Sequence, residues 1–250
     1  MNDIQFAAIP LQQPLYKEVK RQIMAELISG EWKPGTAIPA EKRLSERFAV
    51  SIGTVRKAID ELVAENILIR QQGRGTFVAT HNRDRLLFYF FHIVGQDGTK
   101  QYPVVALDAF ARGKAEAEEA VKLGIRRGDP VIRIRNILKL ADAPVIVDEI
   151  AIDQARFPGL SEKQFAGRPN TIYNLYQDAF GISVVRAQER LRAILADARN
   201  ARLLKVAQKS PLLRIARVAF TYQDVPVELR VSTVNTERHE YWSEIQDTER

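Results

Sequence analysis

The order of patterns in the first third of the chain is the strongest constraint on its fold. Apolar residues recur at helical spacing over residues 15–28, and a short helical segment follows Pro39. Ser51 is a suitable N-cap for a third helix with a continuous apolar stripe. Two β-rich runs, 67–70 and 76–78, then flank the tip Gln-Gln-Gly-Arg-Gly. This order predicts three helices that end in a two-stranded hairpin.

Three helices and a glycine-tipped hairpin are the plan of a winged helix-turn-helix, whose third helix enters the major groove of DNA. If the stripe that begins at Val55 faces the core, Arg56 points outward and can donate two hydrogen bonds to a guanine edge. Thr54 and Lys57 can reach phosphates, and Arg74, between two glycines, can enter a narrow groove. A solvated helix face would carry the same charges, so these residues alone leave both interpretations open.

The rest of the chain predicts a second, α+β domain. We place the first domain at residues 10–78, a polar linker at 79–85 and the second domain at 86–250. Most expected strands follow one another directly, which favours an antiparallel sheet with helices on one side. The expected strands are 86–94, 131–140, 145–152, 182–195, 212–222 and 225–233, and the expected helices are 114–123, 171–180 and 198–206.

Composition excludes several classes of protein. Hydrophobic residues make up 46% of the 250, which is enough for a sizeable core and argues against disorder. No cysteine is present, so disulfide scaffolds and thiolate zinc sites are excluded. No apolar run is long enough to span a membrane and no signal peptide is recognisable, so we expect a cytoplasmic protein. The net charge of +6 is spread over both parts of the chain and does not locate a DNA-binding face.

Residues 14–78 resemble the DNA-binding domain of the GntR superfamily of bacterial transcription regulators, most specifically in "TVRKAIDEL" and "GRGTFV". The remainder resembles the effector-sensing UTRA domain of the HutC subfamily, which has a chorismate-lyase-like fold. The matching segments are "GDPVIRIRNILKLADAPVIVDE", "NTIYNLYQDAFGI" and "PLLRIARVAFTYQDVPVELR". The resemblance implies a repressor that binds an operator in double-stranded DNA and responds to a small-molecule effector.

One recognition helix reads only a few base pairs, so we expect a homodimer on a near-palindromic site. The resemblance adds Lys42 to the DNA-contacting positions, but the family's DNA-contacting arginine is replaced by Ile52, which can at best touch a thymine methyl. Either the operator differs from the family's usual one, or specific binding is weakened. Ala40 also replaces the family's usual serine, which removes an N-cap. The candidate DNA-binding residues are Lys42, Ser51, Ile52, Gly53, Thr54, Arg56, Lys57, Gly73, Arg74 and Gly75.

The second domain departs from the phosphosugar sensors that it resembles. Their Arg-x-Arg pair is Asn136 and Leu138 here, and only Thr171 keeps phosphate-binding chemistry. Arg133 and Arg135 would face the opposite side of their strand. We therefore expect a less basic pocket for a neutral or cationic molecule with an apolar or aromatic body, although each apolar residue could simply be core. The candidate effector-binding residues are Phe90, Phe91, His92, Asn136, Leu138, Asp148, Thr171, Tyr173, Glu228 and Val234.

A lyase-like or other enzyme activity in the second domain is the alternative. The three histidines, His81, His92 and His239, do not have metal-ligand spacing. No nucleophile-elbow, P-loop or dinucleotide-binding motif is present. We therefore predict no catalytic residues, no metal site and no cofactor.

Overall fold

The computed structural model describes residues 14–81 and 90–243. The chain divides into two compact units, and the boundary between them falls between Ala79 and Thr80. The expected linker, 79–85, spans this boundary. Its residues 82–85 lie outside the described residues, as do residues 86–89 of the strand that we expected next.

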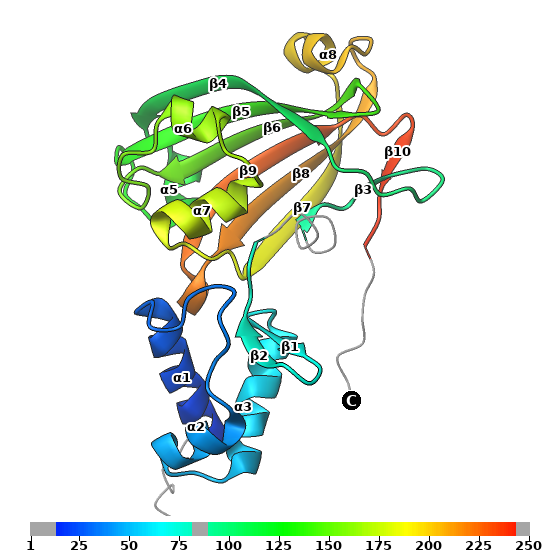
Figure 1. The fold of residues 1–250 in the computed structure, drawn as a ribbon. Coiled ribbons are helices and arrows are strands. Elements are labelled where there is room, and N and C mark those ends of the chain that lie inside the picture. The colour runs from blue at the N-terminus through cyan, green and yellow to red at the C-terminus, as the bar shows by residue number, and fades with distance from the viewer. Residues whose placement is uncertain (1–13, 82–89, 244–250) are drawn as a thin grey trace, which may run out of the picture. The chain divides into compact units, whose positions relative to one another are not determined.

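The first unit is a three-helix bundle with a hairpin, as the sequence predicts (Figure 1). Ile23, Leu44, Val55 and Leu62 are fully buried and bring the three helices around one core. At the hairpin tip Gly73 has φ 70°, a left-handed conformation that glycine adopts without strain. The elements are α1 (Leu15–Ile28), α2 (Glu41–Phe48), α3 (Ile52–Ala64), β1 (Leu68–Gln71) and β2 (Gly75–Val78).

The second unit is built on a six-stranded antiparallel sheet with the order β4-β5-β6-β9-β8-β7 (Figure 1). A separate two-stranded sheet pairs β3 (Ile93–Gly95) with β10 (His239–Tyr241). The six strands are β4 (Val104–Lys114), β5 (Pro130–Leu140), β6 (Ala143–Asp153), β7 (Arg186–Leu195), β8 (Pro211–Phe220) and β9 (Pro226–Val234).

Helices cover both faces of this sheet, so the expectation of helices on one side is wrong. On one face, Tyr173 and Tyr176 pack in a cluster with Ile132 of β5. On the other face, Leu123 packs against Val131. The central strand β6 is apolar on both faces, and both need a cover. The helices are α5 (Ala117–Leu123), α6 (Glu162–Ala166), α7 (Ile172–Phe180), α8 (Ala198–Leu204) and the short 3₁₀ turn η2 (Tyr222–Asp224).

Strand β4 was not predicted from the sequence, and the helix predicted at 114–123 begins only at Ala117. β4 is an edge strand with mostly exposed or half-exposed side chains, so it lacks the alternation of a half-buried strand. Its last residue, Lys114, is where the expected helix was placed to start. The short helix α6 and strand β10 were also not predicted, because each is too short to show a period.

The two consecutive helices α2 and α3 differ in how they begin. Ser51 Oγ accepts a hydrogen bond from the Thr54 amide at 3.1 Å and caps α3, as expected. The N-cap of α2 is Ala40, which makes no side-chain cap bond. The first turn of α2 therefore lacks one acceptor that α3 has.

We expect Ala40→Ser to stabilise α2 by about 1 kcal/mol, because it restores an acceptor for an unpaired amide. Ser51→Ala is the matched control and should destabilise α3 by a similar amount. Hydrogen exchange in the full chain measures both: amides of α2 should exchange more slowly in the first variant, and amides of α3 faster in the second. Unchanged exchange in α2 would contradict the prediction.

Candidate functional site

Helix α3 presents one buried face and one exposed face. Val55, Ala58 and Leu62 are fully buried, whereas Arg56 and Lys57 are exposed. Ile52, in the first turn of α3, is a large apolar side chain with 42% of its surface exposed. The outward face of α3 therefore carries the residues that the sequence analysis assigned to DNA.

The guanidinium of Arg56 is held by a carboxylate on the neighbouring helix. Arg56 Nε and Nη2 donate to Glu41 Oε2 at 2.9 and 2.8 Å. This hydrogen-bonded pair raises the pKa of Arg56 above its ordinary value. Because the pair is solvent-exposed, it contributes little net stability. Another hydrogen-bond acceptor can therefore replace Glu41 as the partner of Arg56 at small cost.

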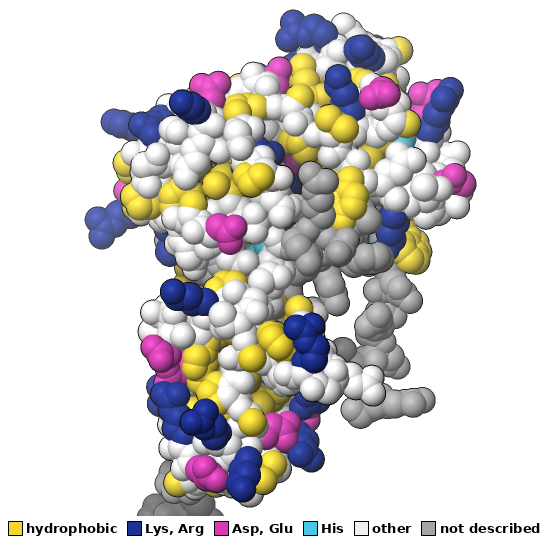
Figure 2. All heavy atoms as spheres, in the orientation of Figure 1, with side chains coloured by type: hydrophobic (Ala, Val, Ile, Leu, Met, Phe, Trp, Pro, Cys, Tyr) yellow, Lys and Arg dark blue, Asp and Glu magenta, His cyan; other side chains and the backbone are white. Residues whose placement is uncertain are grey.

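The other predicted DNA-binding side chains are also on the surface. Lys57 Nζ lies 4.3 Å from the ring centroid of Tyr16. Arg74 is exposed at the hairpin tip, and Lys42 is exposed on α2. On the face shown in Figure 2, Lys and Arg side chains are interspersed with acidic ones and form no continuous basic patch. This distribution agrees with the small charge excess in the sequence.

The second unit contains a cavity of about 410 Å³ on the α7 face of the sheet. Its volume is in the range of small-molecule sites. Glu228 lies outside the lining and bonds to the lining residues Tyr173 and Arg230. The predicted effector residues that line the cavity are Phe90, Phe91, His92, Asn136, Leu138, Asp148, Thr171, Tyr173 and Val234.

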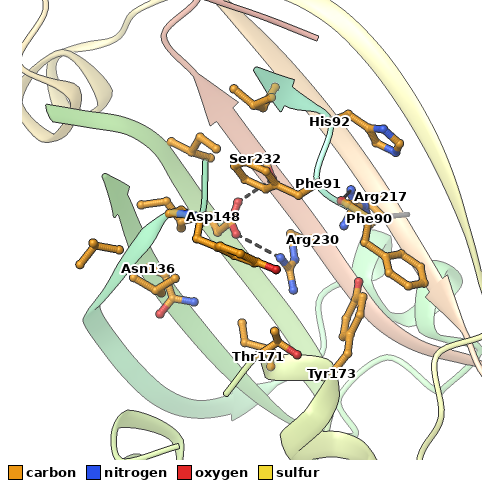
Figure 3. A pocket seen from close by; sticks show the side chains of 18 of the residues that line it. Phe90, Phe91, His92, Asn136, Asp148, Thr171, Tyr173, Arg217, Arg230 and Ser232 are labelled. Carbon is orange, nitrogen blue, oxygen red and sulfur yellow. Dashed lines mark hydrogen bonds and ion pairs between the residues drawn. The ribbon is translucent and has the colours of Figure 1, made fainter. Parts of the chain in front are cut away.

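A buried ionic network forms the sheet side of this cavity (Figure 3). Arg230 donates to Asp148 at 3.2 Å and to the two oxygens of Glu228 at 2.9 and 3.0 Å. Ser232 also donates to Asp148, at 2.5 Å. Tyr173 donates to Glu228 at 3.1 Å, and burial raises the pKa of Tyr173 to about 12. These groups satisfy one another within the protein.

Three arginines line the cavity, so the expectation of a less basic pocket is wrong. They are Arg168, Arg217 and Arg230. Arg217 comes from β8, where it pairs with Glu189 and donates to the backbone oxygen of Phe90. The alternation of polar residues with Leu229 along β9 could have indicated that Arg230 shares a face with the pocket residues.

Arg133 and Arg135 are on the opposite face of β5, as their alternation with Asn136 predicts. Arg133 donates to Glu119 of α5 at 2.7 Å, and Arg135 pairs with Asp108. Neither lines the cavity. A phosphate clamp made by this pair would require a different register of β5 from the one observed.

Asp148 and Glu228 are also not available as acidic partners for a cationic effector. Both carboxylates are buried, and both are already paired with Arg230. The expectation of a cationic ligand rested on these two residues. Their pairing removes its chemical basis.

Asn136 lines the cavity with no hydrogen-bond partner. Its residue surface is fully buried, and neither Nδ2 nor Oδ1 is bonded within the described structure. Asn136 lies opposite Asp148 in the pairing of β5 with β6. The carboxylate oxygens of Asp148 accept hydrogen bonds from Arg230 and Ser232. A buried amide without partners costs folding free energy.

The histidines are not brought together. His81 contacts the rings of Phe90 and Tyr173, whereas His92 lies against Tyr241. Burial lowers the pKa of His92 below its ordinary value. Within residues 14–81 and 90–243, no group of three or more His, Cys, Asp or Glu side chains is placed to hold a metal ion.

Both units match models of known families. Residues 15–78 match "Bacterial regulatory proteins, gntR family", and residues 101–240 match "UTRA domain". The chain belongs to the GntR family, with a UTRA domain. The "Probable fructoselysine utilization operon transcriptional repressor" of Escherichia coli (strain K12) is 30% identical over 222 residues, which cover 87% of this chain and 88% of that protein.

Other relatives agree with this assignment. The "Histidine utilization repressor" of Pseudomonas aeruginosa is 28% identical over 208 residues, which cover 82% of this chain and 80% of the relative. The ligand-binding domain of a GntR-family regulator from Bordetella bronchiseptica superposes with a TM-score of 0.60 and 30% identity, over 64% of this chain and 99% of that one. This GntR-family chain is therefore a DNA-binding transcription regulator with a small-molecule effector domain, and not an enzyme.

None of the helices within residues 14–81 and 90–243 is both long and apolar enough to cross a bilayer.

We expect Asn136→Leu to raise the free energy of unfolding of the ligand-free protein by about 1–3 kcal/mol, because an apolar side chain of similar size replaces an unpaired buried amide. Gln177→Leu is the matched control. Gln177 accepts from the His81 amide and donates to Ser183, so its loss should destabilise the protein. Urea unfolding of the full chain measures both changes. Destabilisation by Asn136→Leu would show that the amide has a structural role.

Proposed function

We propose that this regulator binds a two-fold-related operator as a homodimer, and that a ligand in the UTRA cavity changes its affinity for that operator. The observation that carries the proposal is the exposed face of α3, where Ile52, Arg56 and Lys57 stand opposite a fully buried stripe. The side chain of Arg56 can donate to a guanine edge, and that of Lys57 can reach a phosphate. The glycine-flanked Arg74 would approach an adjacent groove.

Dimerisation follows from the length of sequence that one recognition helix can read. A single helix contacts three or four base edges, which is too few for a unique operator. Two copies related by a two-fold axis read two inverted half-sites and double the number of specific contacts. We therefore propose an operator with near-palindromic half-sites.

The names of the relatives support a role in nutrient use. They are described as repressors of fructoselysine utilization and of histidine utilization. We propose that this chain likewise represses, in the cytoplasm, genes for the use of a small-molecule nutrient. Control requires that the ligand binds the DNA-competent and DNA-incompetent arrangements with different affinity, since equal affinity shifts neither.

Selection of bound sequences from random DNA tests the operator proposal. We expect the unaltered chain to select inverted half-sites, and Ile52→Arg to move one position in each half-site toward guanine, by about 1–3 kcal/mol. Ile52→Val is the control and should keep the original profile, because it still offers only an apolar contact. An unchanged profile for Ile52→Arg would show that residue 52 does not face the bases. Selection of no specific sequence by the unaltered chain would indicate weakened specific binding.

We expect Arg56→Ala to weaken operator binding by about 1–3 kcal/mol and to relax preference at one base pair of each half-site. Arg127→Ala removes the same charge from an exposed position outside the DNA-binding unit and is the control. Binding isotherms at fixed salt concentration measure both. Equal losses in the two variants would reduce the role of Arg56 to general electrostatic attraction.

A further inference from the structure

The cavity of the UTRA domain contains one arginine that no carboxylate of the described residues neutralises. Arg217 is paired with Glu189, and Arg230 is paired with both Asp148 and Glu228. Arg168 differs, since it pairs with no carboxylate of residues 14–81 and 90–243.

The contacts of Arg168 leave part of its guanidinium free to bind a ligand. Nη1 donates to the backbone oxygen of Phe165, and the guanidinium carbon lies 4.3 Å from the centroid of the Phe165 ring. Nε is buried with no hydrogen-bond partner among the described residues. Burial lowers the pKa of Arg168 below its ordinary value, and the nearby Arg230 acts in the same direction. An anion at this position would offset both effects.

The beginning of α7 is at the same edge of the cavity. Residues 168–173 all line it, and they include the N-cap Thr171 and the first turn of the nine-residue helix α7. Thr171 Oγ1 accepts a hydrogen bond from the Asn174 amide. The amides of Ile172 and Tyr173 come before this capped amide in the first turn of α7. The positive end of the helix dipole adds to the attraction that Arg168 exerts on an anion.

The unpartnered amide of Asn136 marks a second polar point on the neighbouring strand β5 (Figure 3). An amide can donate and accept, so it suits a neutral polar group such as a hydroxyl or a carboxamide. The rest of the lining combines the internally paired charged groups with apolar and aromatic side chains, among them Phe90, Phe91 and Leu138.

The pairing of each arginine distinguishes between possible anions. Of the three arginines that line the cavity, only Arg168 pairs with no carboxylate of residues 14–81 and 90–243. One anionic charge would pair with Arg168 and leave the internal pairs intact. A phosphate dianion would carry a second charge that no further unpaired arginine among the described lining residues could meet in a partly dry cavity.

We propose that the effector of this chain is a small carboxylic acid, whose carboxylate binds Arg168 at the start of α7 and whose body carries a neutral polar group that bonds to Asn136. This proposal rests on the proposed function, because it names the ligand class of the same regulatory cavity. It replaces the neutral or cationic ligand that the sequence led us to expect.

Four compounds with one common ring test the assignment on the full chain: 4-hydroxyphenylacetate, 4-hydroxybenzylphosphonate, tyramine and tyrosol. They carry a carboxylate, a phosphonate, an ammonium and an uncharged hydroxyl. We expect 4-hydroxyphenylacetate at millimolar concentration to raise the melting temperature, and the other three to raise it less or not at all. A larger shift with the phosphonate, with tyramine or with tyrosol overturns the assignment, as does the absence of a shift with all four.

Variants locate the carboxylate. Arg168→Gln should bind 4-hydroxyphenylacetate about 10- to 100-fold more weakly by calorimetry, and Arg168→Lys should lose less. Asn136→Leu should also weaken binding while it raises the melting temperature of the ligand-free protein, a combination that a merely structural residue would not show. Arg135→Gln, on the opposite face of β5, is the control and should bind normally. Equal binding by Arg168→Gln and the unaltered chain overturns the proposal. Selection of operator DNA by the unaltered chain, without any of these compounds, tests the proposed function separately.

Discussion

The ion-pair network around Arg230 is the interaction on which the effector cavity depends. It places three charged groups, Arg230, Asp148 and Glu228, among buried residues that are mostly apolar. Charges buried in this way are tolerated only when each has close partners, because removal from water costs several kcal/mol for each ion. Tyr173 and Ser232 supply further hydrogen bonds. The network gives the cavity a polar floor without leaving a free charge on it.

Two groups at the cavity, Arg168 and Asn136, are exceptions to this internal pairing. Native proteins keep few buried polar groups without partners, since each lowers stability. Both exceptions line the same cavity. Arg168 donates to the Phe165 backbone oxygen through Nη1, but its Nε and the amide of Asn136 have no partner among the described residues. Their positions are therefore more informative about the ligand than the larger number of satisfied residues around them.

The DNA-binding unit shows the opposite electrostatic arrangement. The pair of Arg56 with Glu41 is exposed to solvent, where an ion pair has little net value and exchanges partners readily. An arginine held in this way can exchange its carboxylate for another partner at small cost. The buried network of the UTRA domain is rigid by contrast, because breaking it would leave unpaired charges. The same residue types thus form an exposed ion pair in one unit and a buried network in the other.

Local patterns in the sequence determined most of the first unit and the central strands of the second. Helical periodicity predicted the buried stripe from Val55 to Leu62, and strand periodicity predicted the outward positions of Arg133 and Arg135. The cap by Ser51 follows from a residue preference at helix N-termini. All of these depend only on near neighbours in the chain. Only the tertiary structure decided which sheet faces are covered and which charges meet. Arg168, Arg217 and Arg230 come from three separate segments, and their shared cavity depends on strand order and register over distances that no local pattern encodes. For the same reason, the sequence could name Asn136 as a pocket residue but could not show that its amide has no partner.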